Sequence, residues 1–153
     1  MKTQYHLIIS IFFSLIFYLL TSSVLGSILL LVFGFLLDVD HWIDYWIASG
    51  KIKFNVRELF EYSYQCKYEK IHLFLHSIEL LPILFLVGFK YLGEIPAYGI
   101  AIGFITHILT DYSGNSVKPF SYFFIYRLFN RFEFSRIVDM RRLKREISKK
   151  GKG

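Results

Sequence analysis

Histidine and aspartate side chains recur at helical intervals along this chain of 153 residues. His72 and His76 are four residues apart, as are His107 and Asp111, so each pair would share one face of an α-helix. Helical bundles build metal sites from such pairs on facing helices. The sequence therefore predicts a metal centre, whose expected ligands come from four places along the chain: His6, Asp38, Asp40, His41, His72, His76, His107 and Asp111.

Mixed histidine and aspartate ligation is typical of Zn²⁺, with Mn²⁺ and Fe as alternatives, and this many carboxylates allows two or more ions. Such ions would lower the pKa of a bound water to about 7 and polarise a phosphoryl or acyl oxygen. A spare carboxylate could act as the general base, and Asp40 and Glu79 are the two candidates. For His6 the alternative is a role at a helix terminus. Haem is disfavoured, because it uses other axial ligands than aspartate.

The elements that would position these residues are apolar. Residues 7–37 contain no Asp, Glu, Lys, Arg or His, and more than about 18 apolar residues in a row are typical of a membrane span. One helix over this run would be roughly 46 Å long, against a hydrocarbon core of about 30 Å. The polar break at residues 21–23, with Gly26 close behind, predicts two short helices, over 4–20 and 24–41, in preference to one tilted helix.

A second apolar block predicts two more helices, over residues 71–92 and 95–112, with Pro96 in the first turn of the latter. Part of 42–70 is expected to form an interfacial helix. Residues 119–134 form an aromatic and basic segment. We therefore expect an all-α polytopic membrane protein with four short transmembrane helices in a bundle, interfacial helical segments and a basic tail. Its membrane-embedded metal-site domain would cover 1–134 and its cytoplasmic tail 135–153.

The formal charge of +6 is distributed unevenly. In the four-span arrangement every Lys and Arg except Lys90 lies on one side, so the positive-inside rule places both termini in the cytoplasm. Attraction to anionic lipid accounts for the basic balance, and no nucleic-acid partner is expected. Cys66 is the single cysteine, which excludes a disulfide scaffold and predicts a reduced thiol in a cytoplasmic loop. A cleaved secretory signal at the N-terminus is disfavoured, because the apolar run continues past any cleavage site.

Other polar and aromatic residues have plainer interpretations. Asp44 is expected at a solvated edge, with an outer role around the metal as the alternative. Trp42, Tyr45 and Trp46 predict an interfacial aromatic belt. The Phe/Tyr-rich run at 120–129 is expected to rest on the membrane.

Taken in order, these motifs resemble the inner-membrane metal-dependent hydrolase family, also described as LexA-binding membrane hydrolases or as a domain of unknown function. The resemblance covers residues 6 to about 121 and lies in His6, Asp38-Val39-Asp40-His41, His72 to Ser77, Thr106 to Asp111, and Lys118-Pro119-Phe120-Ser121. The family is similar to zinc-dependent phospholipases C and S1/P1 nucleases, whose H-x-x-x-D ligand pair matches His107 and Asp111. The chain departs from the family pattern at Leu37, Leu73 and Leu75, where the family often has Pro, Arg and Thr.

The resemblance implies that the ligands are His6, Asp38 or Asp40, His72, His76, His107 and Asp111. The leading hypothesis is a membrane-bound metal-dependent hydrolase acting on a phosphoester, with a phospholipid or lipid-linked substrate favoured by the membrane location. One alternative is a non-catalytic protein with a structural metal site. Another is a regulatory scaffold whose basic tail recruits a cytosolic partner. Transport is disfavoured, because few ionisable residues lie deeper in the predicted spans.

Overall fold

The computed structural model describes residues 3–59 and 69–150. Within these ranges the chain forms helices, 3-10 turns and isolated β-bridges, which confirms the predicted all-α class. Two compact units are present. The first unit contains Met1–Val39 and Leu75–Asn115, and the second contains Asp40–Phe74 and Ser116–Gly153. Cys66 lies outside the described residues, and the predicted domain boundary at residue 134 stays a prediction.

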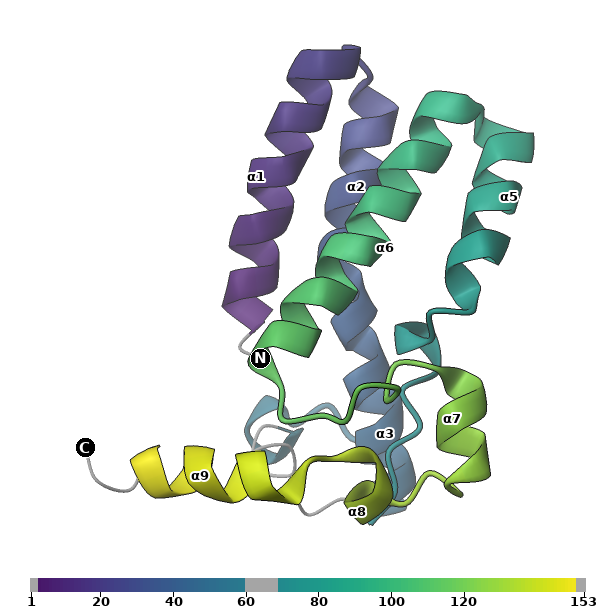
Figure 1. Cartoon of the computed structure of the whole chain (residues 1–153). Coiled ribbons are helices and arrows are strands. Elements are labelled where there is room, and N and C mark those ends of the chain that lie inside the picture. The colour runs from purple at the N-terminus through teal and green to yellow at the C-terminus, as the bar shows by residue number, and fades with distance from the viewer. Residues whose placement is uncertain (1–2, 60–68, 151–153) are drawn as a thin grey trace. The chain divides into compact units, whose positions relative to one another are not determined.

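The α-helices of the first unit run side by side, as Figure 1 shows. Helix α2 packs against α1 and α6, and α6 also packs against α5. A 3-10 turn, η1, follows α2, and another, η2, precedes α5. The bounds are α1 (Thr3–Thr21), α2 (Val24–Phe35), η1 (Leu36–Val39), η2 (Phe74–His76), α5 (Leu80–Leu92) and α6 (Glu94–Gly114). The helices predicted over 4–20 and 95–112 are thus confirmed to within a few residues.

The polar break after α1 forms as predicted. Ser22 adopts a positive φ of 54°, and the Ser23 hydroxyl accepts a hydrogen bond from the amide of Gly26 at 3.1 Å. A serine at this position satisfies one of the amides that the first turn of a helix leaves unpaired. The chain therefore leaves one helix and enters the next within two residues.

Small residues bring α2 and α6 into close contact. A Cβ added to Gly99 would overlap the carbonyl oxygen of Gly26, and one added to Gly103 would overlap the carbonyl oxygen of Leu30. Gly99 and Gly103 have the G-x-x-x-G spacing that lets helices approach closely in membranes. Because successive residues four apart share a helix face, the same face of α6 continues to His107 and Asp111.

The helix predicted over 71–92 begins only at Leu80, so its first nine residues were predicted wrongly. Pro82 lies in the first turn of α5, where its missing N–H costs nothing, whereas inside a longer helix it would cost about 3 kcal/mol. Upstream, Leu73 has a positive φ of 43°. The prediction that His72 and His76 face the same way on one helix is therefore also wrong.

The helix predicted over 24–41 differs at its C-terminal end. It changes to a 3-10 turn at Leu36 and continues as α3 (Asp40–Ser49). Asp38 lies within the turn and Asp40 begins α3. A 3-10 stretch between α-helical segments often marks a functional position, and here its C-terminal end falls between the two aspartates of the D-x-D motif.

Two helical segments in the described part of the chain are long and apolar enough to cross a membrane, namely Gln4–Thr21 and Val24–Ser49. Only 17% of Gln4–Thr21 is buried, and Leu15, Leu19 and Leu20 expose 60–80% of their surface. The core helix of a soluble protein would bury most of such a surface. Helix α5 has 13 residues, which is shorter than a typical span. Length and composition thus support two of the four predicted spans.

The second unit consists of short helices around an irregular chain. They are α3, α7 (Phe124–Phe129), α8 (Phe134–Ile137) and α9 (Met140–Lys150), and residues 56–59 are also helical. Backbone bridges join Lys70 to Glu133 and Val117 to Val138. The basic tail, for which no helix was predicted, forms α9. Its first turn is capped by Asp139, whose carboxylate accepts the amides of Arg141 and Arg142 at 3.0 and 3.1 Å.

The predicted aromatic belt is divided between surface and interior. Tyr45 is completely buried and its hydroxyl donates to the Glu58 carboxylate, so its assignment to an interfacial belt was wrong. That hydrogen bond lowers the pKa of Glu58. Trp42 and Trp46 instead pack on Phe54, which leaves 76% of its own surface exposed.

Candidate metal centre

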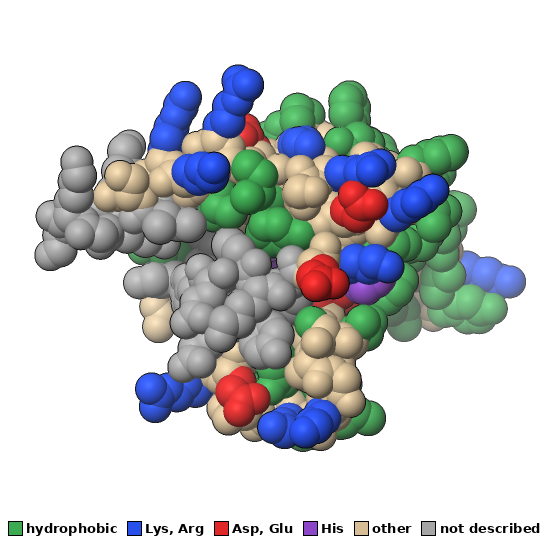
Figure 2. All heavy atoms as spheres, turned by 90° about the horizontal axis from the view of Figure 1, so that it is seen from below, with side chains coloured by type: hydrophobic (Ala, Val, Ile, Leu, Met, Phe, Trp, Pro, Cys, Tyr) green, Lys and Arg blue, Asp and Glu red, His purple; other side chains and the backbone are tan. Residues whose placement is uncertain are grey.

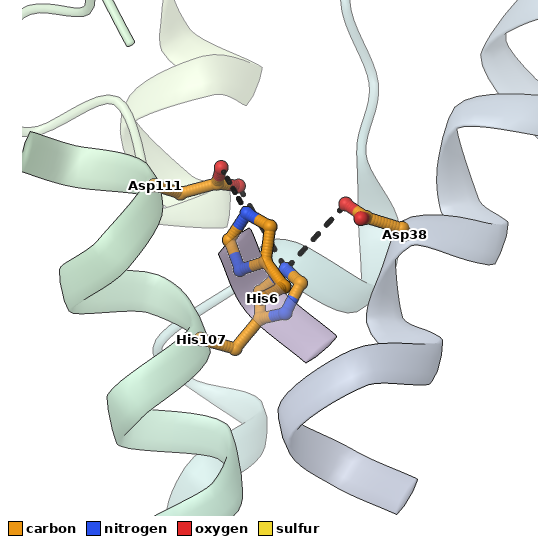
Figure 3. A group of neighbouring side chains, drawn as sticks. All are labelled: His6, Asp38, His107 and Asp111. Carbon is orange, nitrogen blue, oxygen red and sulfur yellow. Dashed lines mark hydrogen bonds and ion pairs between the residues drawn. The ribbon is translucent and has the colours of Figure 1, made fainter. Parts of the chain in front are cut away.

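The first unit brings five of the predicted ligands together at one end of its helices. His6 comes from α1, Asp38 from η1, His76 from η2, and His107 and Asp111 from the last turns of α6. His6, His76, His107 and Asp111 each expose 2% of their surface or less. Figure 3 shows four of these side chains, from α1, η1 and α6, pointing toward one another. Burying so many ionisable groups is costly unless they are paired or bind an ion.

The distances within this cluster suit a shared cation. His6 Nε2 lies 3.1 Å from Asp111 Oδ1, and His107 Nε2 lies 3.7 Å from Asp38 Oδ1 and 3.8 Å from Asp111 Oδ2. One ligand atom from each of these four residues lies within 4.8 Å of the others. Nitrogen and oxygen atoms bound to one Zn²⁺ lie about 2 Å from it, and so about 3–4 Å from one another.

The orientation of His107 is fixed by the backbone of α2. Its Nδ1 lies 3.0 Å from the carbonyl oxygen of Gly34, and a carbonyl only accepts, so Nδ1 carries the proton. In the neutral imidazole Nε2 then carries the lone pair, and it is the nitrogen that lies nearest the two aspartates. Metal-binding histidines are commonly oriented in this way by a carbonyl on the other ring nitrogen. Gly34 therefore belongs to the support of the candidate centre, which the sequence did not indicate.

His76 adds a third imidazole to the same group. Its Nε2 lies 3.1 Å from Nε2 of His107 and 3.4 Å from Asp111 Oδ2. The ring of His6 stacks on that of His107, with centroids 4.2 Å apart. Three imidazoles thus converge on two carboxylates, which is a donor set that divalent transition metals prefer.

Two details of the cluster fit a metal. Nδ1 of His6 is buried and has no hydrogen-bond partner among the described residues, and a buried polar atom left without a protein partner is often explained by an ion or water. Asn115, one turn beyond Asp111, donates from its side-chain amide to Asp111 Oδ1 at 2.9 Å and so orients that carboxylate. The four-residue spacing between Asp111 and Asn115 predicts this contact, although Asn115 was not among the predicted site residues.

The remaining predicted ligands belong to the second unit. Asp40 is completely buried at the start of α3 and His41 follows it. The side chain of His72 pairs with Asp44, through Nδ1 and Asp44 Oδ1 at 2.9 Å. Glu79, the second candidate base, is half-buried at the N-cap of α5 in the first unit, where its side chain makes no capping hydrogen bond.

Asp44 is buried, so its assignment to a solvated edge was wrong. Its carboxylate accepts the amides of His72 at 3.0 Å and Leu73 at 3.3 Å, in addition to the His72 ring. These bonds divert the chain at residues 72 and 73 away from a helix. An outer role for Asp44 around the metal, the alternative considered for this residue, stays a prediction, because its partner His72 is not among the residues of the first-unit site.

The chain was compared with protein-family models, curated proteins and solved structures, and none of them matches it. The cluster of His6, Asp38, His76, His107 and Asp111, which we call the first-unit cluster, is thus described by its geometry alone. Its buried imidazoles and carboxylates could hold a metal ion.

Proposed function

We propose that the chain is a membrane-bound, metal-dependent hydrolase that cleaves a phosphoester. The observation that carries this proposal is the convergence of the first-unit cluster, with four of its five residues almost completely buried. The motif order supports it, because it resembles that of the inner-membrane metal-dependent hydrolases. His6, Asp38, His76, His107 and Asp111 would hold the metal, with Zn²⁺ as the first candidate and Mn²⁺ or Fe as the others.

The metal would supply Lewis-acid activation of water and of the phosphoryl oxygen. The protein's own contribution is to hold the donor atoms in place. The Gly34 carbonyl orients His107, and the Asn115 amide orients Asp111. Asp40 and Glu79 remain the candidates for the general base that accepts a proton from water.

The proposed location is the inner membrane, with α1, α2, α5 and α6 as four spans and both termini in the cytoplasm. Exposed leucines on α1 and the G-x-x-x-G contact between α2 and α6 support it. Helix α5 would be about 20 Å long, so the bilayer beside it must thin. A cluster at the membrane surface favours a phospholipid or lipid-linked phosphoester as the substrate.

The test is hydrolysis of a chromogenic phosphodiester and of phospholipid vesicles by the purified full-length chain, with and without added Zn²⁺ or Mn²⁺. Metal-dependent turnover is expected in the wild type, with loss of at least about 100-fold in Asp111→Asn. Asp139→Asn, which alters a carboxylate at the start of α9 instead, should retain the rate. Equal rates in all three proteins would contradict the proposal.

The deep burial of the cluster favours a second candidate function, a structural metal site without catalysis. Closed structural sites leave no position for water. In that case the wild type would contain metal and Asp111→Asn would be less stable, but neither would hydrolyse any of the phosphoesters.

A further inference from the structure

Helix α7 is turned with its charged residue inward and its apolar residues outward. Arg127 exposes 1% of its surface, whereas Ile125 exposes 56%, Leu128 53% and Phe129 82%. These three apolar residues are spaced three and four apart, so they share one face of the helix. Short helices on a soluble surface normally have the opposite arrangement. The outward face of α7 is therefore suited to an apolar neighbour.

The orientation of α7 is fixed by hydrogen bonds from the buried guanidinium of Arg127. Arg127 Nη1 donates to the carbonyl of Ser121 and Nη2 donates to the carbonyl of Leu73, both at 2.9 Å. Turning the helix to bury Phe129 would break both bonds and leave a buried donor unsatisfied, which costs more than an ordinary hydrogen bond contributes. The outward position of the apolar face is therefore a stable feature of the second unit.

The apolar surface continues beyond the helix, and cations lie near it in the sequence. Phe120 and Phe123 expose 60% and 39% of their surface. Arg131 is exposed just beyond the helix, and Arg136, which forms an ion pair with Glu133 at 2.6 Å, is exposed further along. Figure 2 shows Lys and Arg side chains interspersed with hydrophobic ones on the face that it views. We call Phe120, Phe123, Ile125, Leu128 and Phe129 the α7 apolar face. Aromatic and aliphatic residues flanked by cations are typical of segments that lie in the headgroup region of a membrane.

We propose that the α7 apolar face inserts into the interfacial region of a bilayer that contains anionic phospholipid. The flanking cations, Arg131 foremost, complement its negative surface potential. This inference rests on the proposed membrane location of the first unit. Only residues 115–123 separate α6 from α7, so α7 must stay within about 30 Å of the end of a membrane-spanning α6.

The test is site-directed spin labelling of the full-length chain in lipid vesicles. Cys66→Ser removes the single native thiol, and Leu128→Cys places a label on the α7 apolar face. Ser135→Cys is the matched control, because Ser135 is an exposed polar residue in α8 of the same unit. Leu15→Cys, at an exposed leucine of α1, reports on the first unit. Accessibility is measured to oxygen, which partitions into lipid, and to a water-soluble nickel chelate.

In vesicles of phosphatidylcholine and phosphatidylglycerol, the label at position 128 should be accessible to oxygen and shielded from nickel, at a depth of about 5–10 Å. The label at position 135 should be accessible to nickel. Pure phosphatidylcholine should raise the nickel accessibility at position 128. Ile125→Cys repeats the measurement if Leu128→Cys does not fold.

The proposal is overturned if position 128 is as accessible to nickel as position 135, or if neither reagent reaches it, because a protein partner would then cover the face. It is also overturned if the two lipid compositions give the same accessibility. The label at position 15 distinguishes a failure of the α7 inference from a failure of the proposed membrane location. If position 15 lies in lipid and position 128 does not, only the α7 inference fails, whereas the membrane location itself fails if neither position does.

Discussion

The carbonyl oxygen of Gly34 accepts a hydrogen bond from Nδ1 of His107 at 3.0 Å. This bond links helix packing to the candidate metal centre, because α2 and α6 must approach closely for the carbonyl to reach the ring. The approach depends on glycines of both helices, and Gly103 lies one turn before His107 on the face that packs against α2. The ligand geometry is therefore set by backbone contacts outside the ligand cluster.

Gly103→Ala should loosen this contact. The added Cβ would overlap the Leu30 carbonyl and lie 3.1 Å from the Gly34 amide nitrogen, and backbone atoms cannot move aside without separating the helices. We expect a destabilisation of about 1–3 kcal/mol and weaker metal binding. Thermal unfolding in detergent measures the first effect. Ile105→Ala, at a position on α6 that is 41% exposed, is the control and should change stability much less.

Asn115→Ala should weaken metal binding without removing a ligand. The Asn115 amide orients Asp111, and loss of such outer partners typically costs about 10–100-fold in metal affinity. Metal titration by calorimetry checks this effect. Asn130→Ala is a matched control, since Asn130 donates to the carbonyl of Tyr126 outside the cluster. Equal metal affinities in the two variants would mean that Asn115 does not support the centre.

Asp44→Ala should destabilise the second unit. The change leaves the amides of His72 and Leu73 without the carboxylate that accepts them, at a cost of about 1–3 kcal/mol. Hydrogen exchange at these two amides should accelerate accordingly. Glu69→Ala, which removes an exposed carboxylate from the same unit, should leave their exchange unchanged.

The N-terminal turn of α9 should weaken in acid. The amides of Arg142 and Arg141 hold the pKa of Asp139 below its usual value, so the unfolded state binds the proton more readily than the folded one. The stabilisation is therefore fully present above the ordinary aspartate pKa and is lost as the pH falls through the lower folded value. The rate of hydrogen exchange at the Arg142 amide, measured as a function of pH, reports this loss of stabilisation. Asp139→Asn should remove most of this pH dependence.

Local signals in the sequence predicted much of the fold. The break at Ser22 and the start of α6 beside Pro96 depend on residues next to them, so sequence patterns located both. The start of α5 was misjudged because Pro82 was overlooked and because a distant carboxylate, Asp44, captures the amides near residue 72. Helix α9 was missed because its cap, Asp139, lies just before a run of like charges.

The first-unit cluster was predictable in part. His107 and Asp111 share a helix face by their spacing, so their pairing follows from periodicity alone. That His6 and Asp38 reach the same place depends on how three helices pack. Their assignment to the site came from hydropathy and the motif order. The supporting role of Gly34 is a tertiary contact between α2 and α6 that no sequence pattern indicates, whereas that of Asn115 follows from its four-residue spacing from Asp111.

The central claim, that the first-unit cluster holds a divalent metal, is tested most directly by elemental analysis of the full-length chain purified without chelators. The same measurement is made on Asp111→Asn and on Asp139→Asn. We expect about one or more equivalents of Zn, Mn or Fe in the wild type and in Asp139→Asn, and a large loss in Asp111→Asn, because metal affinity depends on the anionic ligand. Metal content that is unchanged in Asp111→Asn, or no metal in the wild type even after incubation with Zn²⁺, Mn²⁺ or Fe²⁺, would contradict the account.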